Sequence, residues 1–143
     1  MRTGMRDLST LPKANIHVHL ENAVRPATLR ELANRHAIAL PDRLSGDRCV
    51  VAGFGDFFVQ NAAVRACLID AEDFRRVAYE FCEDEAAQGV RYAEVTFTAA
   101  AHGERTGNWD GPLAAVVDGL DAGRDTFGIG CRLILDHSRR RPV

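Results

Sequence analysis

The stretch Asn15-Ile16-His17-Val18-His19-Leu20-Glu21 decides how the rest of the chain is interpreted. It carries a His-x-His pair among apolar and β-branched residues, which indicates a buried strand. In a strand, residues i and i+2 point to the same side and lie about 6.5–7 Å apart along the backbone. Two imidazoles at that spacing can reach one ion at the roughly 2.0–2.1 Å of a zinc–nitrogen bond. His17 and His19 are therefore candidate metal ligands, and the alternative is two partly buried histidines hydrogen-bonded at a strand end.

The neighbouring residues predict a strand followed by a helix. Leu11-Pro12 leads into a strand from Ala14 to Leu20, with proline at the entrance, where no ladder donor is needed. Arg25-Pro26 starts a helix, because proline is tolerated in the first turn. His36 falls on the apolar face of that helix and is interpreted as a helix-side histidine, not a ligand.

Further along, the periodicity predicts two helices, each followed by a strand. An amphipathic helix begins near Glu72 and stops at Gly89, which can take the left-handed conformation that ends helices. A second strand runs from Val90 to Phe97. Another helix begins at Asp110, and a third strand covers Cys131 to Leu135. This order is typical of β-α-β units in a parallel sheet.

Two of these segments carry a family signature. Leu11-Pro12-Lys13-Ala14-Asn15-Ile16-His17-Val18-His19-Leu20-Glu21, followed by Arg25-Pro26-x-Thr28-Leu29-x-Glu31-Leu32-Ala33, resembles the opening of the adenosine deaminase family of metal-dependent amidohydrolases. Supporting similarity occurs at Gly89-Val90-Arg91-Tyr92-Ala93-Glu94-Val95 and at Arg132-Leu133-Ile134-Leu135. The resemblance covers nearly the whole chain in register.

The resemblance implies an α/β fold, the N-terminal part of a TIM (β/α)8 barrel with about three strands and their connecting helices. Complete barrels need about 250 residues, so residues 1–143 are expected to form a single incomplete barrel domain. The implied reaction is hydrolytic deamination of adenosine or a related aminopurine, with one Zn²⁺ ion activating water. The family draws its remaining ligands and its general acid from the second half, so this chain is expected to be truncated and inactive or very weak alone.

The resemblance also assigns a substrate role to Glu21. It stands where classical adenosine deaminases carry an aspartate that contacts the ribose, so Glu21 is a candidate substrate-binding residue. A longer carboxylate there favours a smaller or different purine, adenine among them. Asn22 replaces a glycine of the family motif, and asparagine is the least costly substitute if that position needs a positive φ.

Two aromatic residues are further substrate-binding candidates. In the family an apolar helix near this place covers the substrate, which makes Phe57 and Phe58 candidate pocket residues by resemblance. The alternative, favoured by the usual burial of aromatics, is a short helix that packs its aromatic residues Phe54, Phe57 and Phe58 into the core. Asn61 stands where the family carries another large apolar residue.

Four other polar residues have roles predicted from their position in the chain. Glu94 lies in a strand and is expected to have a structural role, with a contact to the site as the alternative. His102, in a predicted loop from Ala100 to Trp109, is expected to be an exposed loop histidine. Asp136 and His137 follow the third strand at the edge where barrel chemistry collects, so they are site candidates by position alone.

Composition limits the partners and the compartment. A net charge of −2 and a pI near 6.2 disfavour nucleic-acid binding as the main activity. No apolar run approaches the ~18 residues of a membrane span, and no signal peptide is visible at the N-terminus. The expected partner is a small purine nucleoside or base. The cysteines are scattered along the sequence, which favours reduced thiols and therefore a cytoplasmic location. They are Cys49, Cys67, Cys82 and Cys131.

Two alternative functions compete with deamination. The first is a non-catalytic remnant or interaction module that pairs its open strand edges with another copy or another chain, so that self-association is possible. The second is a different His-x-His amidohydrolase with two metals bridged by a carboxylated lysine. Lys13 is the only lysine in the sequence and precedes the first histidine, so this chain has no lysine placed to bridge two metals.

Overall fold

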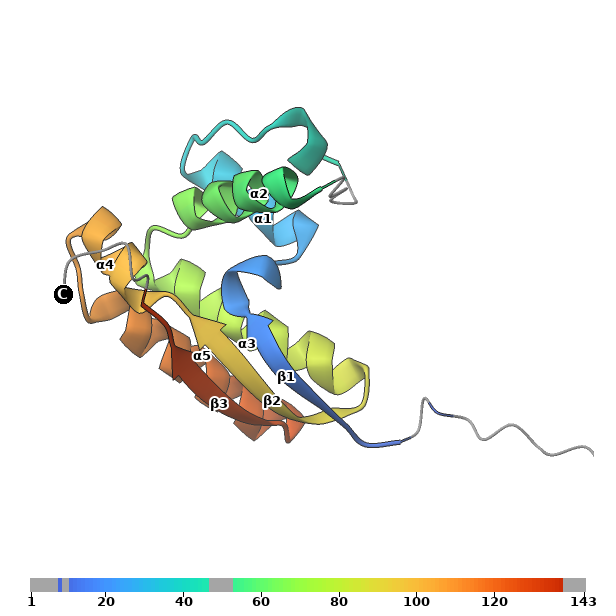
Figure 1. The fold of residues 1–143 in the computed structure, drawn as a ribbon. Helices are drawn as coiled ribbons and strands as arrows, with labels where there is room; N and C mark the ends of the chain where they lie inside the picture. The colour runs from blue at the N-terminus through green and yellow to red at the C-terminus, as the bar shows by residue number, and fades with distance from the viewer. Residues whose placement is uncertain (1–7, 9–10, 47–52, 138–143) are drawn as a thin grey trace, which may run out of the picture.

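Three parallel strands form one sheet in the order β1-β2-β3. The computed structural model describes residue 8, residues 11–46 and residues 53–137, so the prediction for Cys49 lies outside the described residues. The strands are β1 (Lys13–His19), β2 (Val90–Phe97) and β3 (Gly130–Leu135) (Figure 1). The second predicted strand is confirmed residue for residue, and the other two differ by one residue at their ends.

Five helices accompany the sheet in the described residues. They are α1 (Pro26–Arg35), α2 (Phe54–Cys67), α3 (Ala71–Ala87), α4 (Ala99–Thr106) and α5 (Gly111–Phe127), with short 3₁₀ turns η2 (Leu20–Asn22) and η3 (Asp42–Leu44). None of these helices has both the length and the apolar character needed to cross a membrane.

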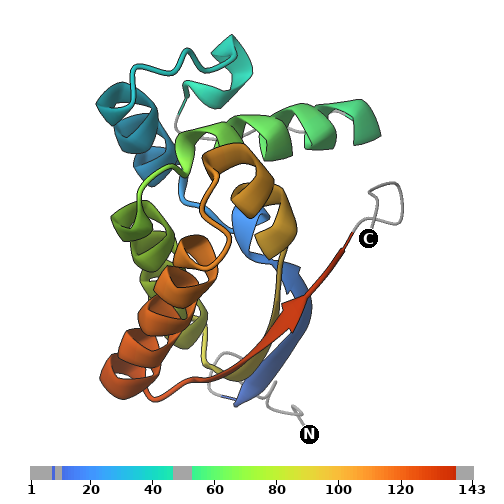
Figure 2. The same ribbon diagram turned by 90° about the vertical axis from the view of Figure 1, so that its left-hand side faces the viewer.

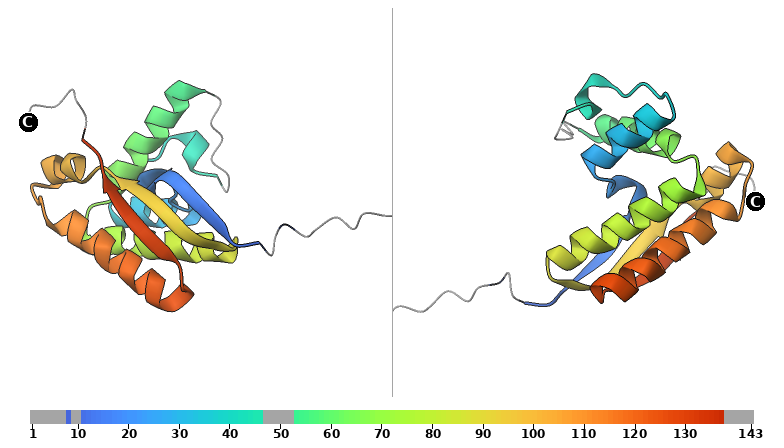
Figure 3. Two further views of the ribbon diagram at one scale, coloured as in Figure 1. Left: turned by 60° about the horizontal axis from the view of Figure 1, so that its bottom comes forward. Right: turned by 180° about the vertical axis from the view of Figure 1, so that it is seen from behind.

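Among the described residues, the helices that pack on the sheet cover one of its faces. The right-hand view of Figure 3 shows α3 and α5 side by side against that face, while α1 and α2 lie beyond the carboxyl end of β1 (Figures 1 and 2). Ala93, Val95 and Phe97 are fully buried and alternate along β2, so they face the helices. Glu94 points to the other face, where it is half-buried and accepts a hydrogen bond from the Tyr92 hydroxyl at 2.9 Å. The architecture is α/β, as predicted.

Side chains cap the start of α3, and its end follows the predicted signal at Gly89. Asp70 and Asp73 form a capping box at its start, in which each side chain accepts a backbone N–H of the other. Gly89 follows its end with a φ of 82°, in the left-handed region that favours glycine. The chain then enters β2 directly.

The predicted loop from Ala100 to Trp109 is wrong, because most of it forms α4. Ala101, His102 and Gly103 are buried in this helix. At Gly103 a Cβ would lie 2.6 Å from the Trp109 ring, so a glycine is needed for the chain to fold back there. The apolar pattern of α4 is hard to recognise in the sequence, because three residues of this helix are alanines, whose small side chains contribute little to such a pattern.

Two glycines allow α5 to pack closely on α3. A Cβ at Gly119 would lie 2.3 Å from the Arg75 carbonyl oxygen, and one at Gly123 would lie 2.4 Å from the Cys82 Cβ. Because the first neighbour is backbone, it cannot move aside like the end of a flexible side chain. The close packing of α5 on α3 therefore depends on having glycine, which carries no side chain, at positions 119 and 123.

Replacing Gly119 with alanine is expected to destabilise the chain by about 1–3 kcal/mol, because α5 must move away from α3. Gly55 in α2 is the matched control, since a Cβ there meets nothing within 4 Å. Both substitutions gain helix propensity, so Gly55→Ala should be neutral or stabilising by up to about 1 kcal/mol. Urea unfolding measures both, and equal midpoints for the two variants would contradict the packing argument.

Candidate metal and substrate site

His17 and His19 lie together at the carboxyl end of β1, but not through regular strand geometry. The step from Asn15 to Val18 in β1 matches the shorter step from Ala93 to Val95 in β2, so β1 holds one extra residue. This is a β-bulge, and His17 within it has a φ of 67°. A non-glycine residue in that region is uncommon, and such strain concentrates at functional sites.

The spacing of the two imidazole rings is compatible with one shared zinc ion. The two rings have centroids 5.7 Å apart and are tilted by 45°. The centre of a zinc-bound imidazole lies about 3 Å from the ion, so two rings on one ion have centres roughly 5–6 Å apart. His17 is exposed and His19 half-buried, which leaves the pair open to a ligand.

Glu21 follows two residues later in η2, and its side chain is buried, with 1% of the residue exposed. Its Oε1 accepts the Thr98 backbone N–H at 3.2 Å and lies 3.2 Å from Nε2 of His102. Its Oε2 is buried and has no hydrogen-bond partner among the described residues. The carboxylate therefore joins the ends of β1 and β2 through one oxygen only.

Hydrogen bonding keeps the Glu21 carboxyl ionised despite its burial. Burial raises the pKa, whereas the hydrogen bonds from His102 and from backbone N–H groups lower it, and the net pKa lies below the ordinary value of 4.5. Glu21 is thus an acceptor at neutral pH.

The prediction that His102 is an exposed loop histidine is wrong. It is fully buried in α4, stacked on Phe97 with centroids 5.1 Å apart and edge-on to Phe74 at 4.9 Å. Its Nδ1 lies 3.4 Å from Nη2 of Arg105. The sequence carries no local signal for this burial, because the carboxylate that His102 contacts is 81 residues away.

The aromatic residues of α2 form an exposed cluster. Phe54, Phe57 and Phe58 contact one another with centroids 4.9–6.1 Å apart. Phe54 is 76% exposed and Phe58 58%, so the prediction that this helix would bury its aromatics is wrong for these two. Phe57 is half-buried.

A side-chain hydrogen bond links α2 to the turn that carries Glu21. Asn61 Nδ2 donates to Asn22 Oδ1 at 3.2 Å. Both asparagines are positions at which the sequence departs from the family pattern, and these two departures contact each other. Asn22 does not have a positive φ, so its side chain and not its backbone accounts for the asparagine.

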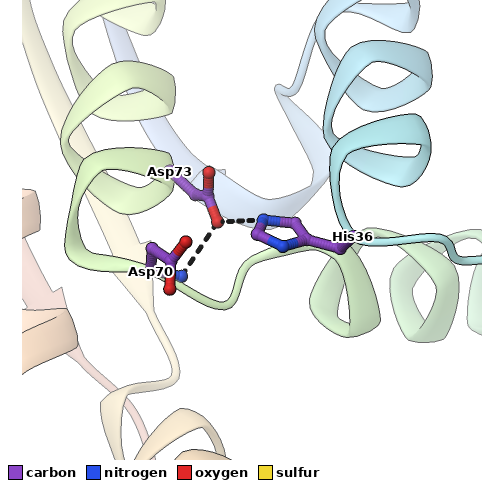
Figure 4. A group of neighbouring side chains, drawn as sticks. All are labelled: His36, Asp70 and Asp73. Carbon is purple, nitrogen blue, oxygen red and sulfur yellow. Dashed lines mark hydrogen bonds and ion pairs between the residues drawn. The ribbon is translucent and has the colours of Figure 1, made fainter.

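A second group of possible metal ligands is built from His36, Asp70 and Asp73, drawn in Figure 4. Asp73 Oδ2 already accepts from His36 at 2.7 Å and from the backbone N–H groups of Ile69 and Asp70, while Arg35 donates to Oδ1 at 2.9 Å. These donors occupy the carboxylate and place a guanidinium beside it. We therefore assign this group to helix capping and not to metal binding.

Asp136 and His137 are not brought into the His-x-His site by any contact within the described residues. The Asp136 backbone N–H donates to the Phe97 carbonyl at 3.4 Å, which continues the β2–β3 pairing, and His137 is exposed. A cavity of about 290 Å³ lies between α1 and the segment that follows it, and it shares no residue with the site.

Comparison with known proteins gives a consistent assignment. A sequence model described as adenosine deaminase matches residues 12–142. An adenosine deaminase from Enterococcus faecalis is 34% identical over 131 residues, which are 87% of this chain and 39% of that protein. The chain spans about two fifths of the length of the curated relatives it matches.

Solved structures share the fold. An adenine deaminase from Arthrobacter aurescens superposes with a TM-score of 0.76 at 28% identity, over 87% of this chain and 39% of that chain. A zinc-bound amidohydrolase from Burkholderia ambifaria gives a TM-score of 0.72 at 30% identity, over 94% and 40%. The three strands and their helices thus correspond to part of a TIM-barrel deaminase.

Proposed function

Since the chain belongs to the adenosine deaminase family, we propose that it supplies the His-x-His part of a zinc site for hydrolytic deamination of adenosine, adenine or a related aminopurine. The observation that carries the proposal is the pair His17 and His19, placed by a strained bulge at ring spacing suited to one ion. The zinc in the Burkholderia protein supports the choice of metal.

Each site residue has a distinct role in this proposal. His17 and His19 hold one Zn²⁺, which when bound supplies Lewis-acid activation of water. The ionised Glu21 accepts a hydrogen bond from an N–H or O–H of the substrate. Phe57 and Phe58 present aromatic faces on which a purine can stack. The proposed compartment is the cytoplasm, as the cysteine spacing predicts.

Activity of this chain alone is expected to be weak or absent. A catalytic zinc site takes three or more protein ligands. His17 and His19 supply two ligands, and within the described residues the one group of three or more possible ligands that lie together is the capping group of His36, Asp70 and Asp73. Deamination therefore requires further ligands to complete the shell.

The purified chain is expected to bind about one Zn²⁺, measured by calorimetry and metal analysis. Replacing His17 and His19 together with alanine should weaken zinc binding by at least about 100-fold, since even groups that only orient metal ligands contribute roughly 10–100-fold. His36→Gln is the control and should bind zinc like the wild type. Unchanged zinc affinity in the double variant, or lost zinc affinity in the control, would show that zinc binds at another site.

A chimera tests the reaction itself. Residues 12–142 replace the matching segment of the Arthrobacter aurescens adenine deaminase, and ammonia release is measured with adenine and with adenosine. We expect deamination that falls at least about 100-fold when His17 and His19 become alanine. The ratio of the deamination rates with adenine and with adenosine reports the effect of Glu21 on substrate preference. A folded, zinc-loaded chimera inactive on both purines would refute the proposal.

We also propose that the isolated chain self-associates through its sheet. Within the described residues β1 and β3 each have one unpaired edge, and Ile16, Ile134 and Leu135 are exposed. Sedimentation should show a concentration-dependent dimer or larger species. Ile134→Lys is expected to shift it toward monomer, while Val117→Lys on the exposed face of α5 should not. A strictly monomeric wild type would contradict this.

A further inference from the structure

Glu21 and His102 form a fully buried pair that joins two segments of the candidate site. Glu21 lies in η2, directly after the strand of His17 and His19, and His102 lies in α4, which follows β2. Their side chains meet at 3.2 Å with 2% and 0% exposed. The pair therefore determines how the turn after β1 is held against the segment after β2.

The surroundings of His102 determine which ring nitrogen carries the proton. The Arg105 guanidinium, 3.4 Å from Nδ1, has only donors. Nδ1 must then present its lone pair, so Nε2 carries the hydrogen and donates it to Glu21 Oε1. Phe97 stacks on the ring and Phe74 packs against it in a T-shaped arrangement, which hinders rotation of the ring.

The two carboxylate oxygens of Glu21 are therefore not equivalent. Oε1 receives both donors, the Thr98 N–H and His102, while Oε2 receives none from the described residues. A buried charged oxygen without a donor is costly, and such costs persist where an atom is reserved for a ligand. The bond from His102 selects which oxygen is left free.

We propose that His102 is a positioning residue of this site: it holds the Glu21 carboxylate so that Oε2 receives an N–H or O–H donor of the purine ligand. The inference rests on the proposed function for its ligand, but the orientation of the pair belongs to this chain alone. His102 touches no substrate and acts only through Glu21.

Two variants separate positioning from packing. His102→Phe keeps an aromatic ring between Phe74 and Phe97 but removes the donor. His102→Gln loses the ring but retains an N–H that can reach Glu21. A purely structural role predicts that phenylalanine is the better substitute, whereas positioning predicts that glutamine is.

The first measurement is nitrogen NMR of the histidine rings in the full chain. We expect His102 as a single Nε2–H tautomer with a slowly exchanging ring proton. An Nδ1–H tautomer, or averaging between the two, would overturn the inference whatever the chain binds.

The second measurement is the affinity of the zinc-loaded chain for adenine and for adenosine, followed by calorimetry. His102→Phe should weaken purine binding by about 10-fold, the effect of one lost charge-assisted hydrogen bond, and His102→Gln should recover most of it. Zinc affinity should stay the same in both variants. Wild-type purine affinity in His102→Phe would overturn the inference.

The failure of the inference and that of the proposed function are distinguishable. If zinc binding depends on His17 and His19 but neither purine binds, the role of Oε2 is overturned and the metal site stands. If zinc binding does not depend on those histidines, the proposed function fails, and the tautomer measurement still decides whether His102 orients Glu21.

Discussion

The parallel pairing of β1 with β2 is the constraint on which the rest of the structure depends. Parallel neighbours need a long crossover connection, and here residues 20–89 make it with α1, α2 and α3. The next crossover adds α5 beside α3 on the same face, where Gly119 and Gly123 allow the two helices to approach. All three carboxyl ends then meet at one edge of the sheet, and that edge collects the polar residues of the site.

At this edge, strain and buried charge occur within a few residues. His17 adopts a left-handed conformation in a bulge, and Glu21 buries an ionised carboxylate with one oxygen unpaired. Both features cost stability, and a fold without a function at this edge would have little reason to keep them. By contrast, the acidic group around Asp73 is fully hydrogen-bonded and belongs to the start of α3. The difference lies in unsatisfied atoms, not in the types of residue.

The elements with strong periodicity were predictable. The helix from Ala71 to Ala87 repeats an apolar stripe over several turns, and the strand from Val90 to Phe97 is dense in β-branched and aromatic residues, so local pattern and final structure agree. The helix around His102 was not predictable, because three alanines and a glycine offer no pattern. The exposure of Phe54 and Phe58 was missed for a related reason, since burial depends on which neighbours the fold brings to that helix.

Local spacing and motif are enough to assign the family, the α/β order of elements and the candidate site residues His17, His19 and Glu21. The folded chain shows, in addition, that a bulge brings the two imidazoles together, that Asn22 contacts Asn61, and that His102 contacts Glu21. Those contacts join residues 39 to 81 positions apart or depend on strand register. Local sequence patterns predict neither the long-range contacts nor the strand register, because both arise only when the parallel strands pair and align their ends.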